Sequence, residues 1–336
     1  MNRVGSQGKG ESVWLGWFTF ATAQRFALLL ERMGRADECK HWQERAAALK
    51  KAIEHAAWDG AWYVRAFYDD GSPLGSKGSA SCRLDSIAQS WAVLSGGADK
   101  ERALVALRSA DAALVRSDDR LVLLLEPPFR GARHDPGYIA AYPPGVRENG
   151  GQYTHAAAWL GWAHACVGDG AGAAKIFRLL NPASRARSPD AVERYRVEPY
   201  VLAADVYSSP PFIGRGGWTW YTGAAAWTWR LGIEAMLGLY PEGGGLRFDP
   251  CIPPEWPGFE ATVHLGQSEV HVVVENPDRV SRGIRQLSLG GIELASPLLH
   301  LDEASRGTYD VRIVLGNARG TESQPPLPGV AGARSC

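Results

Sequence analysis

Residues 146–155 read VRENGGQYTH and place an arginine, a carboxylate, two amides and a histidine around two glycines. If a helix begins at the second glycine, Gln152 and His155 share one face, because residues three apart are neighbours on a helix. His155 would then lie in the first turns, where free backbone N–H groups and the helix dipole favour an anion. Arg147 and Glu148 could reach the same space. A hydrogen-bonded core histidine beside a surface ion pair fits the same spacing, so both interpretations stay open.

Residues 214–223 read GRGGWTWYTG and combine a permissive backbone with aromatic rings. Glycines let the backbone approach a ligand closely, and aromatic faces can stack against sugar C–H groups. Thr222 and the backbone N–H of Gly223, at a helix start, would form a second anion contact. The alternative is a glycine-rich turn whose aromatic rings belong to the core. A third candidate, Glu198, precedes Pro199 in extended backbone and could equally be a capping carboxylate or part of a surface pair.

The elements that must position these residues change character near residue 240. Before it, apolar residues recur at helical spacing, and we expect helices over residues 11–33, 36–58, 85–94, 100–114, 151–167, 171–180 and 218–239. After it, short alternating segments bounded by turn residues predict strands over residues 246–248, 262–265, 270–275, 286–289 and 309–315. The fold is therefore expected to be mainly α: an incomplete helical toroid over residues 1–240, then a small antiparallel β-domain over 241–317. Residues 318–336 are polar and rich in Pro and Gly, which predicts a disordered tail.

The composition restricts the class of protein. The chain has 336 residues, no formal net charge, 21% charged and 45% hydrophobic residues, which is typical of a globular protein with one large and one smaller domain. A neutral balance argues against nucleic-acid binding. The sequence contains no zinc-ligand spacing, phosphate-binding loop or dinucleotide fingerprint. We therefore predict no metal site and no organic cofactor.

The cysteines and the N-terminal region bear on the compartment. Five cysteines are scattered without a Cys-x-x-Cys spacing: Cys39, Cys82, Cys166, Cys251 and Cys336. We expect reduced, mostly buried thiols and a cytoplasmic location. The N-terminus has no apolar signal core. The apolar residues 13–30 are interrupted by Gln24 and Arg25, which favours a buried helix over a membrane span, so no membrane segment is expected in this chain.

Six stretches together resemble glycoside hydrolase family 94, the inverting glycoside phosphorylases. They are NRVG…GKGESVWLGWF, CRLDSIAQSWAVLSG, YPPGVRENGGQYTHAAAW, YRVEPYVLAADVYS, GRGGWTWYTGAAAW and LRFDPCIPPEWPGF. The resemblance runs in order from residue 1 to about residue 315 and is greatest to the β-1,2-glucan branch: 1,2-β-oligoglucan phosphorylases and the C-terminal domain of cyclic β-1,2-glucan synthases. It implies the latter part of an (α/α)6 barrel followed by a jelly-roll-like β-domain. The β-sandwich, the helical linker and the first part of the barrel would precede this chain.

The resemblance also implies a reaction. Inorganic phosphate attacks the anomeric carbon of a terminal glucose while a carboxylic acid protonates the leaving oxygen, and no second carboxylate is needed as a base. Phosphate is thus a co-substrate, with a β-linked glucan as partner. Phosphate contacts are implied for His155, Thr222 and Gly223, and sugar contacts for Arg147, Glu148 and Gln152. The general acid is an Asp expected just before Met1, in a missing N-terminal part, so no catalytic residue is expected within this chain.

Two other functions are compatible with the sequence. The chain could be a non-catalytic glucan-binding or regulatory module that kept the sugar site. It could also be a hydrolase that recruited Glu148, Asp205 or Asp85 as acid and base, although no spacing favours this. For the phosphorylase hypothesis we expect a cytoplasmic chain, whose parent protein can be a membrane-anchored synthase. We expect His155 and Thr222 to face each other across one cavity.

Overall fold

The computed structural model describes residues 1–131, 134–220, 223–301 and 305–316. They form two compact units. The helical unit consists of Met1–Ala163 and Ile176–Thr228, and the β-rich unit consists of His164–Lys175 and the described residues from Trp229 onward. The tail expected over residues 318–336 lies outside the described residues. The domain boundary expected at residue 240 stays a prediction.

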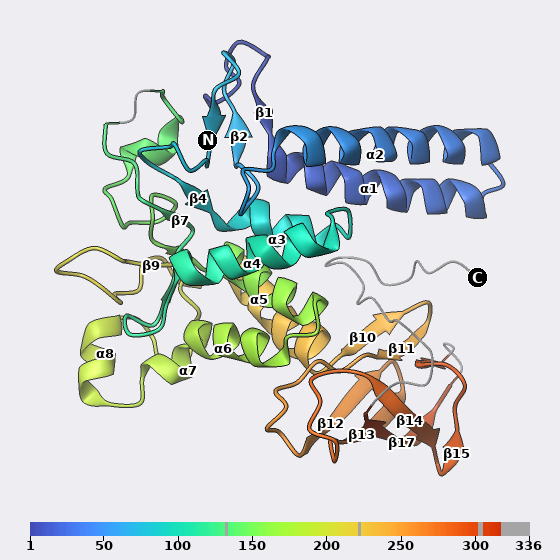
Figure 1. Cartoon of the computed structure of the whole chain (residues 1–336). Coiled ribbons are helices and arrows are strands. Elements are labelled where there is room, and N and C mark those ends of the chain that lie inside the picture. Colours follow the sequence, from blue (N-terminus) through green and yellow to red (C-terminus); the bar gives the residue numbers. More distant parts are fainter. Residues whose placement is uncertain (132–133, 221–222, 302–304, 317–336) are drawn as a thin grey trace. The chain divides into compact units, whose positions relative to one another are not determined.

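Nine α-helices lie among the described residues (Figure 1). Their bounds are α1 Val13–Arg32, α2 Ala36–Ala56, α3 Ser86–Leu94, α4 Lys100–Leu114, α5 Thr154–Cys166, α6 Gly170–Leu180, α7 Pro182–Arg185, α8 Pro189–Tyr195 and α9 Gly223–Arg230. A 3-10 turn, η1, covers Tyr138–Ala141, and a π-helical segment, η2, covers Leu231–Met236. Six of the seven expected helices are confirmed, with shifts of up to three residues at their ends.

The seventh expectation, one helix over residues 218–239, was wrong. Only Gly223–Arg230 is α-helical, η2 follows it directly, and Leu239 already belongs to a strand. Trp218 lies outside any helix or strand, and its carbonyl accepts a hydrogen bond of 2.6 Å from the N–H of Ala204. A long-range contact therefore overrides the local helical pattern.

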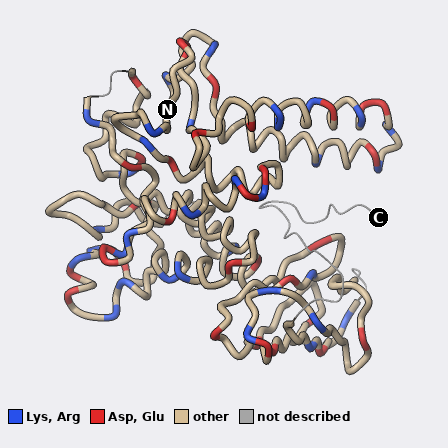
Figure 2. The backbone as a smooth tube through the Cα atoms, in the orientation of Figure 1, with Lys and Arg blue, Asp and Glu red and all other residues tan. Residues whose placement is uncertain are grey.

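The pair α1 and α2 shows how sequence sets the helices. α1 ends before Gly34, whose φ of 72° is a left-handed conformation that glycine adopts without strain. α2 begins with Asp37 and Glu38, whose charges favour the positive end of the helix dipole. The two helices lie side by side (Figure 1) and bury Phe20, Ala23 and Ala46 in one cluster and Ala27, Leu30 and Cys39 in another. Acidic and basic residues are interspersed along the outer side of α2 (Figure 2).

Helix α1 keeps an apolar stripe on its surface. The stripe consists of Leu15, Phe18, Phe26, Leu29 and Met33, each of which is between 41% and 59% exposed. Their spacing places all five on one side of the helix. α1 is also the one helix in the described part of the chain that is long and apolar enough to cross a membrane. Core helices of soluble proteins meet the same criterion, and 39% of its most apolar window is buried.

A two-residue strand directly precedes each of three helices and pairs with a strand from later in the chain. β1 (Glu11–Ser12), which precedes α1, forms a small antiparallel sheet with β2 (Ala66–Phe67) and β3 (Pro73–Leu74). β4 (Leu84–Asp85) pairs with β7 (Leu125–Glu126) before α3, and β8 (Gln152–Tyr153) pairs with β9 (Asp205–Val206) before α5. β5 (Val115–Arg116) and β6 (Leu121–Val122) form a hairpin after α4.

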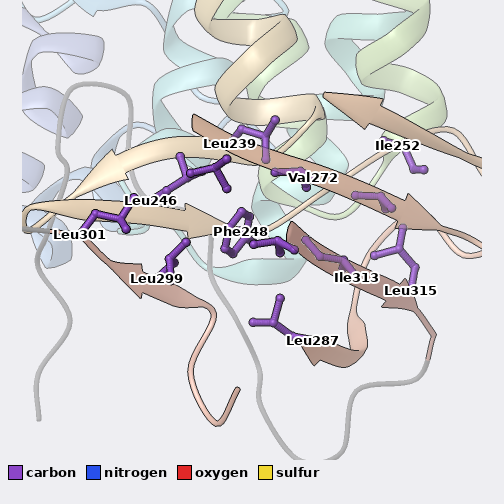
Figure 3. Close-up of a cluster of buried hydrophobic side chains, with 13 residues drawn as sticks. Leu239, Leu246, Phe248, Ile252, Val272, Leu287, Leu299, Leu301, Ile313 and Leu315 are labelled. Atoms are coloured by element: carbon purple, nitrogen blue, oxygen red, sulfur yellow. The ribbon is translucent and has the colours of Figure 1, made fainter. Parts of the chain in front are cut away.

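The β-rich unit is built on two sheets. The first contains β10 (Leu239–Glu242), β11 (Gly245–Phe248) and β16 (Leu298–His300). The second has the order β12 (Gly258–Leu265), β13 (Ser268–Glu275), β17 (Gly307–Leu315), β14 (Ile284–Leu289) and β15 (Ile292–Glu293). Alternate residues of β13 point into the core. Its buried valines join Phe248 and Ile313 in an apolar cluster contributed by both sheets (Figure 3).

The strands expected from the alternating pattern are all present, but the expectation of a purely antiparallel domain was wrong. β13 and β17 run parallel, with Val272 opposite Val311 and Val274 opposite Ile313. Parallel strands need a long crossover connection, and the segment containing β14, β15 and β16 supplies it. The sequence thus predicted which residues form strands but not the direction of this pair.

Candidate functional site

The loop that carries Arg147 and Glu148 is held by one buried amide. Asn149 is 0% exposed. Its Oδ1 accepts a hydrogen bond of 2.7 Å from the N–H of Phe129, and its Nδ2 donates to the carbonyls of Phe129 at 3.2 Å and Tyr142 at 2.7 Å. Arg147 itself has φ of 50°, a left-handed conformation that is uncommon for a side chain of this kind. Asn149 thus organises the turn that presents both charged residues.

The pairing of β8 with β9 brings residues 205–218 beside this loop. Two hydrogen bonds of Ser208 connect the segments: its N–H donates to the carbonyl of Gly145, and its hydroxyl donates to the carbonyl of Gly150. Gly217 is required by close packing: a Cβ atom there would lie 2.3 Å from Oδ1 of Asp205. Two segments about 60 residues apart in sequence therefore form one wall.

Arg147 is the centre of the charged part of the site. Its Nε donates to Oε2 of Glu148 at 3.4 Å, and its guanidinium carbon lies 4.6 Å from the ring centroid of Trp218 and 5.4 Å from that of Tyr142. Burial alone would lower the pKa of Arg147, but the Glu148 and Asp205 carboxylates outweigh it and raise the pKa. The Nη1 atom is buried with no hydrogen-bond partner among the described residues. One donor of this arginine is therefore free for a ligand.

Asp205 lies close to the arginine but is not in an ion pair with it. The residue is 1% exposed, and its Oδ1 accepts from the N–H of Trp218 at 3.3 Å. Its Oδ2 is buried without a partner in the described part of the chain. Burial raises the pKa of Asp205, while the Trp218 N–H and Arg147 oppose the shift. The site thus contains a second unused polar atom.

His155 is the second residue of α5 and has an unused ring nitrogen. Its ring centroid lies 4.3 Å from that of Trp159, 5.7 Å from that of Trp227 and 6.4 Å from that of Tyr153. The Nε2 atom is buried without a hydrogen-bond partner among the described residues. Burial lowers the pKa of His155, so the ring is neutral at pH 7. A neutral imidazole with a free nitrogen at a helix start can donate one hydrogen bond to an oxyanion.

The partner expected for His155, Thr222, lies outside the described residues, so the facing arrangement of these two stays a prediction. Gly223 is described: it begins α9, and a Cβ atom there would meet no atom within 4 Å. One helical turn later, the Trp227 ring stacks on His155 at an interplanar angle of 20°. The start of α9 therefore lies one turn from a residue that contacts His155.

Gln152 and Tyr153 occupy opposite faces of β8, because side chains alternate along a strand. Gln152 is 1% exposed, and its Oε1 accepts from the N–H of Val122 and from Nη2 of Arg185, each at 3.1 Å. Tyr153 instead lies near Glu148 and Arg147. Burial is the largest cause of its raised pKa; the charge of Glu148 adds to the rise and that of Arg147 opposes it. Sugar contact by Gln152 stays a prediction. Tyr153, which the sequence argument missed, is the β8 side chain beside the charged residues.

Two further carboxylates named as candidates have partners of their own. Asp85 is 2% exposed, accepts from the N–H of Ile87 as the N-cap of α3, and lies 3.4 Å from Nε of Arg65. Burial raises the pKa of Asp85 and the arginine opposes the shift. Glu198 is half-buried and accepts at 2.8 Å from the indole N–H of Trp220, which is itself 66% exposed. No group of three His, Cys, Asp or Glu residues in the described ranges could hold a metal ion.

The family follows from a comparison of sequences. The profile described as the glycosyl hydrolase 94 superfamily, catalytic domain, matches residues 1–238. The chain belongs to the glycosyl hydrolase 94 superfamily. A second profile, the C-terminal domain of glycosyl hydrolase family 65, matches residues 239–281 of this glycosyl hydrolase 94 chain. The expected family membership is confirmed.

The curated relatives of this family member include a glucan synthase and several phosphorylases. The chain is 48% identical over 279 residues to the cyclic beta-(1,2)-glucan synthase NdvB of Rhizobium meliloti (strain 1021). This alignment covers 83% of this chain and 10% of the relative. It is 31% identical to the N,N'-diacetylchitobiose phosphorylase of Vibrio proteolyticus, over 92% of this chain and 38% of the relative. It is also 31% identical to the solabiose phosphorylase of Paenibacillus borealis, over 88% of this chain and 38% of the relative. The chain thus spans well under half the length of these relatives.

Proposed function

We propose that this chain forms the phosphate- and sugar-binding part of an active site that phosphorolyses a β-linked glucan, with β-1,2-glucan as the substrate class. An oxygen of inorganic phosphate would bond to the anomeric carbon while the glycosidic C–O bond breaks and the leaving oxygen takes a proton. The phosphorylases among the relatives support this reaction class, and the cyclic beta-(1,2)-glucan synthase supports the glucan. Phosphate would be the co-substrate, with no further cofactor.

The observation that carries the proposal is the unused Nε2 atom of His155. A buried polar atom without a partner costs free energy, so its presence at a helix start is explained by a ligand that completes its hydrogen bond. The N–H groups at the start of α9, from Gly223 onward, and the Thr222 hydroxyl are the other proposed phosphate contacts. Because His155 is neutral at pH 7, it would donate without adding charge.

The sugar is proposed to lie against the neighbouring wall. Arg147 holds a free donor, Glu148 is paired with it, and the Trp218 ring beside the guanidinium group is 56% exposed. Charged groups held in fixed positions beside an exposed aromatic face suit a sugar ring, which presents hydroxyls at its rim and C–H groups on its faces. Gln152 would act on this wall through the position of β8.

We propose that the general acid and the remainder of an (α/α)6 barrel come from a segment outside this chain. Two observations support this. The buried Asp85 is engaged by Arg65 and by the backbone of α3, and Glu148 is engaged by Arg147. The apolar stripe on α1 also exposes five large side chains, which further barrel helices would bury. The free, mostly buried thiols support a cytoplasmic location for this part of the protein.

The test compares this chain with a version extended at its N-terminus by the preceding coding sequence. Both are incubated with β-1,2-glucan oligosaccharides and phosphate, and glucose 1-phosphate is measured. General acid catalysis contributes about a hundred- to ten-thousand-fold, so we expect turnover in the extended version and a loss of that order in this chain. His155→Phe in the extended version, which keeps an aromatic ring, is expected to abolish saturation by phosphate.

Three outcomes would contradict the proposal in different ways. Equal turnover by both versions would place the acid within this chain, and Asp205→Asn would then identify it. Release of free glucose would indicate a hydrolase. Binding of the glucan by calorimetry with no turnover in either version would indicate a glucan-binding module.

A further inference from the structure

A pocket lies in the helical unit, between the β5–β6 hairpin and α8. It is a cavity of about 180 Å³ whose polar lining consists of Asp119, Arg120, Arg185, Ser188, Asp190 and Arg194. The elements around α7 and α8 carry basic and acidic residues close together (Figure 2). Three guanidinium groups thus share one cavity. Their like charges repel one another, and arginines normally offset such repulsion by pairing with carboxylates.

Arg185 is the central residue of this pocket. It is 5% exposed. Its Nη2 donates to the carbonyl of Arg120 at 2.5 Å and to Oε1 of Gln152 at 3.1 Å, and its guanidinium carbon lies 5.6 Å from the ring centroid of Tyr195. Its Nε is buried with no hydrogen-bond partner in the described part of the chain. Burial lowers the pKa of Arg185 to about 10, which still leaves it charged at pH 7.

The charges of the pocket are not balanced by ion pairs. None of the three guanidinium groups lies within 4.0 Å of a carboxylate oxygen of the residues that the structure describes. Asp119 and Asp190 line the same cavity, so the chain brings carboxylates close without letting them neutralise the arginines. Arg185 is the buried one of the three, and a buried charge without a counter-charge is unfavourable. An anion in the cavity would remove that cost.

The backbone holds the arginines in place. Arg120 has φ of 58°, a left-handed conformation at the end of the β5–β6 turn, and its Nη2 donates to the carbonyl of Ser184 at 2.5 Å. Arg120 and the α7 segment thus bind each other, since Arg185 donates back to the carbonyl of Arg120. Gly214, with φ of 87°, leaves room for the stem of Arg194, whose Cδ would lie 2.9 Å from a Cβ atom there.

We propose that this pocket binds a small oxyanion of the phosphate type, either inorganic phosphate or the phosphate group of a sugar phosphate. Planar guanidinium groups match the geometry of phosphate oxygens, and the cavity holds a phosphate-sized anion with several waters. None of the residues that line the pocket was assigned to the His155 site. The Gln152 amide, on the face of β8 opposite Tyr153, is hydrogen-bonded to the buried arginine.

The test follows phosphate binding through the nuclear magnetic resonance signals of the arginine Nε–H groups. Each signal is assigned by substituting the arginine that produces it. The experiment uses the whole chain carrying His155→Phe, which removes the proposed catalytic phosphate contact and separates the two sites. Millimolar inorganic phosphate is expected to shift the Nε–H resonances of Arg185 and Arg194. Chloride at equal ionic strength is expected to leave them unchanged, because screening alone does not fill a site. Glucose 1-phosphate in place of phosphate distinguishes the two sources of the anion.

Arg194→Ala removes an exposed side chain that forms no hydrogen bond or ion pair with the described residues. We expect it to weaken phosphate binding about tenfold through loss of a charge-assisted hydrogen bond. Arg187→Ala is the matched control: it removes the same charge from an exposed position outside the cavity lining and is expected to change the affinity by less than about twofold. Arg185→Met should abolish the shifts, and circular dichroism checks that this variant folds. Equal shifts with phosphate and chloride, or equal weakening by Arg194→Ala and Arg187→Ala, would overturn the proposal.

Discussion

Asn149 anchors the loop that presents Arg147 and Glu148, and Asn149→Ala tests how much that anchor contributes. The change removes three buried hydrogen bonds, one accepted from and one donated to the backbone of Phe129, and one donated to the carbonyl of Tyr142. At roughly 1 kcal/mol for each bond, the free energy of unfolding should fall by about 3 kcal/mol. Urea unfolding followed by tryptophan fluorescence measures it. Glucan affinity should fall about tenfold, because both charged side chains lose their fixed positions.

Asn276 in the β-rich unit provides a matched control. It is 1% exposed and also makes three hydrogen bonds, accepting from the N–H of Val280 and donating to the carbonyls of Trp256 and Val280. Asn276→Ala should therefore cost a similar free energy of unfolding, about 3 kcal/mol, and leave glucan affinity unchanged. If both variants lose equal stability and equal affinity, or if Asn149→Ala binds glucan normally, the loop does not depend on its amide and the reasoning is refuted.

His155→Phe should flatten the acid side of the stability curve. Because burial lowers the pKa of His155 below 6.5, the unfolded chain binds the proton at a higher pH than the folded chain. The contribution of the neutral ring to the free energy of unfolding is therefore complete above pH 6.5 and is lost as pH falls through the folded-state pKa. Unfolding curves measured on either side of pH 6.5 would detect the difference. Gly217→Ala should lower the free energy of unfolding by about 2 kcal/mol, because the new Cβ would push the Asp205 carboxylate aside. Gly78→Ala is the control: its Cβ would approach only the Ser76 hydroxyl, at 3.7 Å, and stability should change by less than about 1 kcal/mol. Thermal melts of both variants measure the difference. Arg65→Met should cost about 3–5 kcal/mol in urea unfolding by leaving Asp85 buried without its partner, and adding Asp85→Asn should recover part of that loss. No recovery in the double variant would show that the arginine acts through packing alone.

The helices could be predicted where local sequence decides the structure. The bounds of α4, Lys100–Leu114, match the expectation, because buried Ala103, Leu107, Ala110 and Leu114 recur at helical spacing and Asp99 caps the first turn. The segment at residue 218 could not be predicted in this way. Trp218 is hydrogen-bonded to Ala204, which is fourteen positions away in sequence and comes into contact only when the chain folds.

The candidate site was predictable as a set of residues but not as a geometry. The motif around residue 150 contains Arg147, Glu148 and His155, and the structure keeps them in the same region. A helix was expected from Gly151, yet α5 begins at Thr154 after two residues of strand. Over those two residues the side-chain period is that of a strand, so Tyr153 faces the charged residues and Gln152 faces the core. Strand pairing with a distant segment, which periodicity does not reveal, decided this.

The β-rich unit is not a continuous piece of chain, and this has a consequence for how such proteins can exchange parts. The segment His164–Lys175 belongs to this unit. Arg282 donates to the carbonyl of Cys166, and Gly170 packs so closely on Ile252 that a Cβ atom would lie 2.1 Å from its carbonyl oxygen. A recombination event that transferred only the residues after 239 would leave Ile252 and Arg282 facing a foreign segment. Exchange of this unit between family members therefore requires that the turn between α5 and α6 be inherited with it, so the two stretches must evolve together despite their separation in the gene.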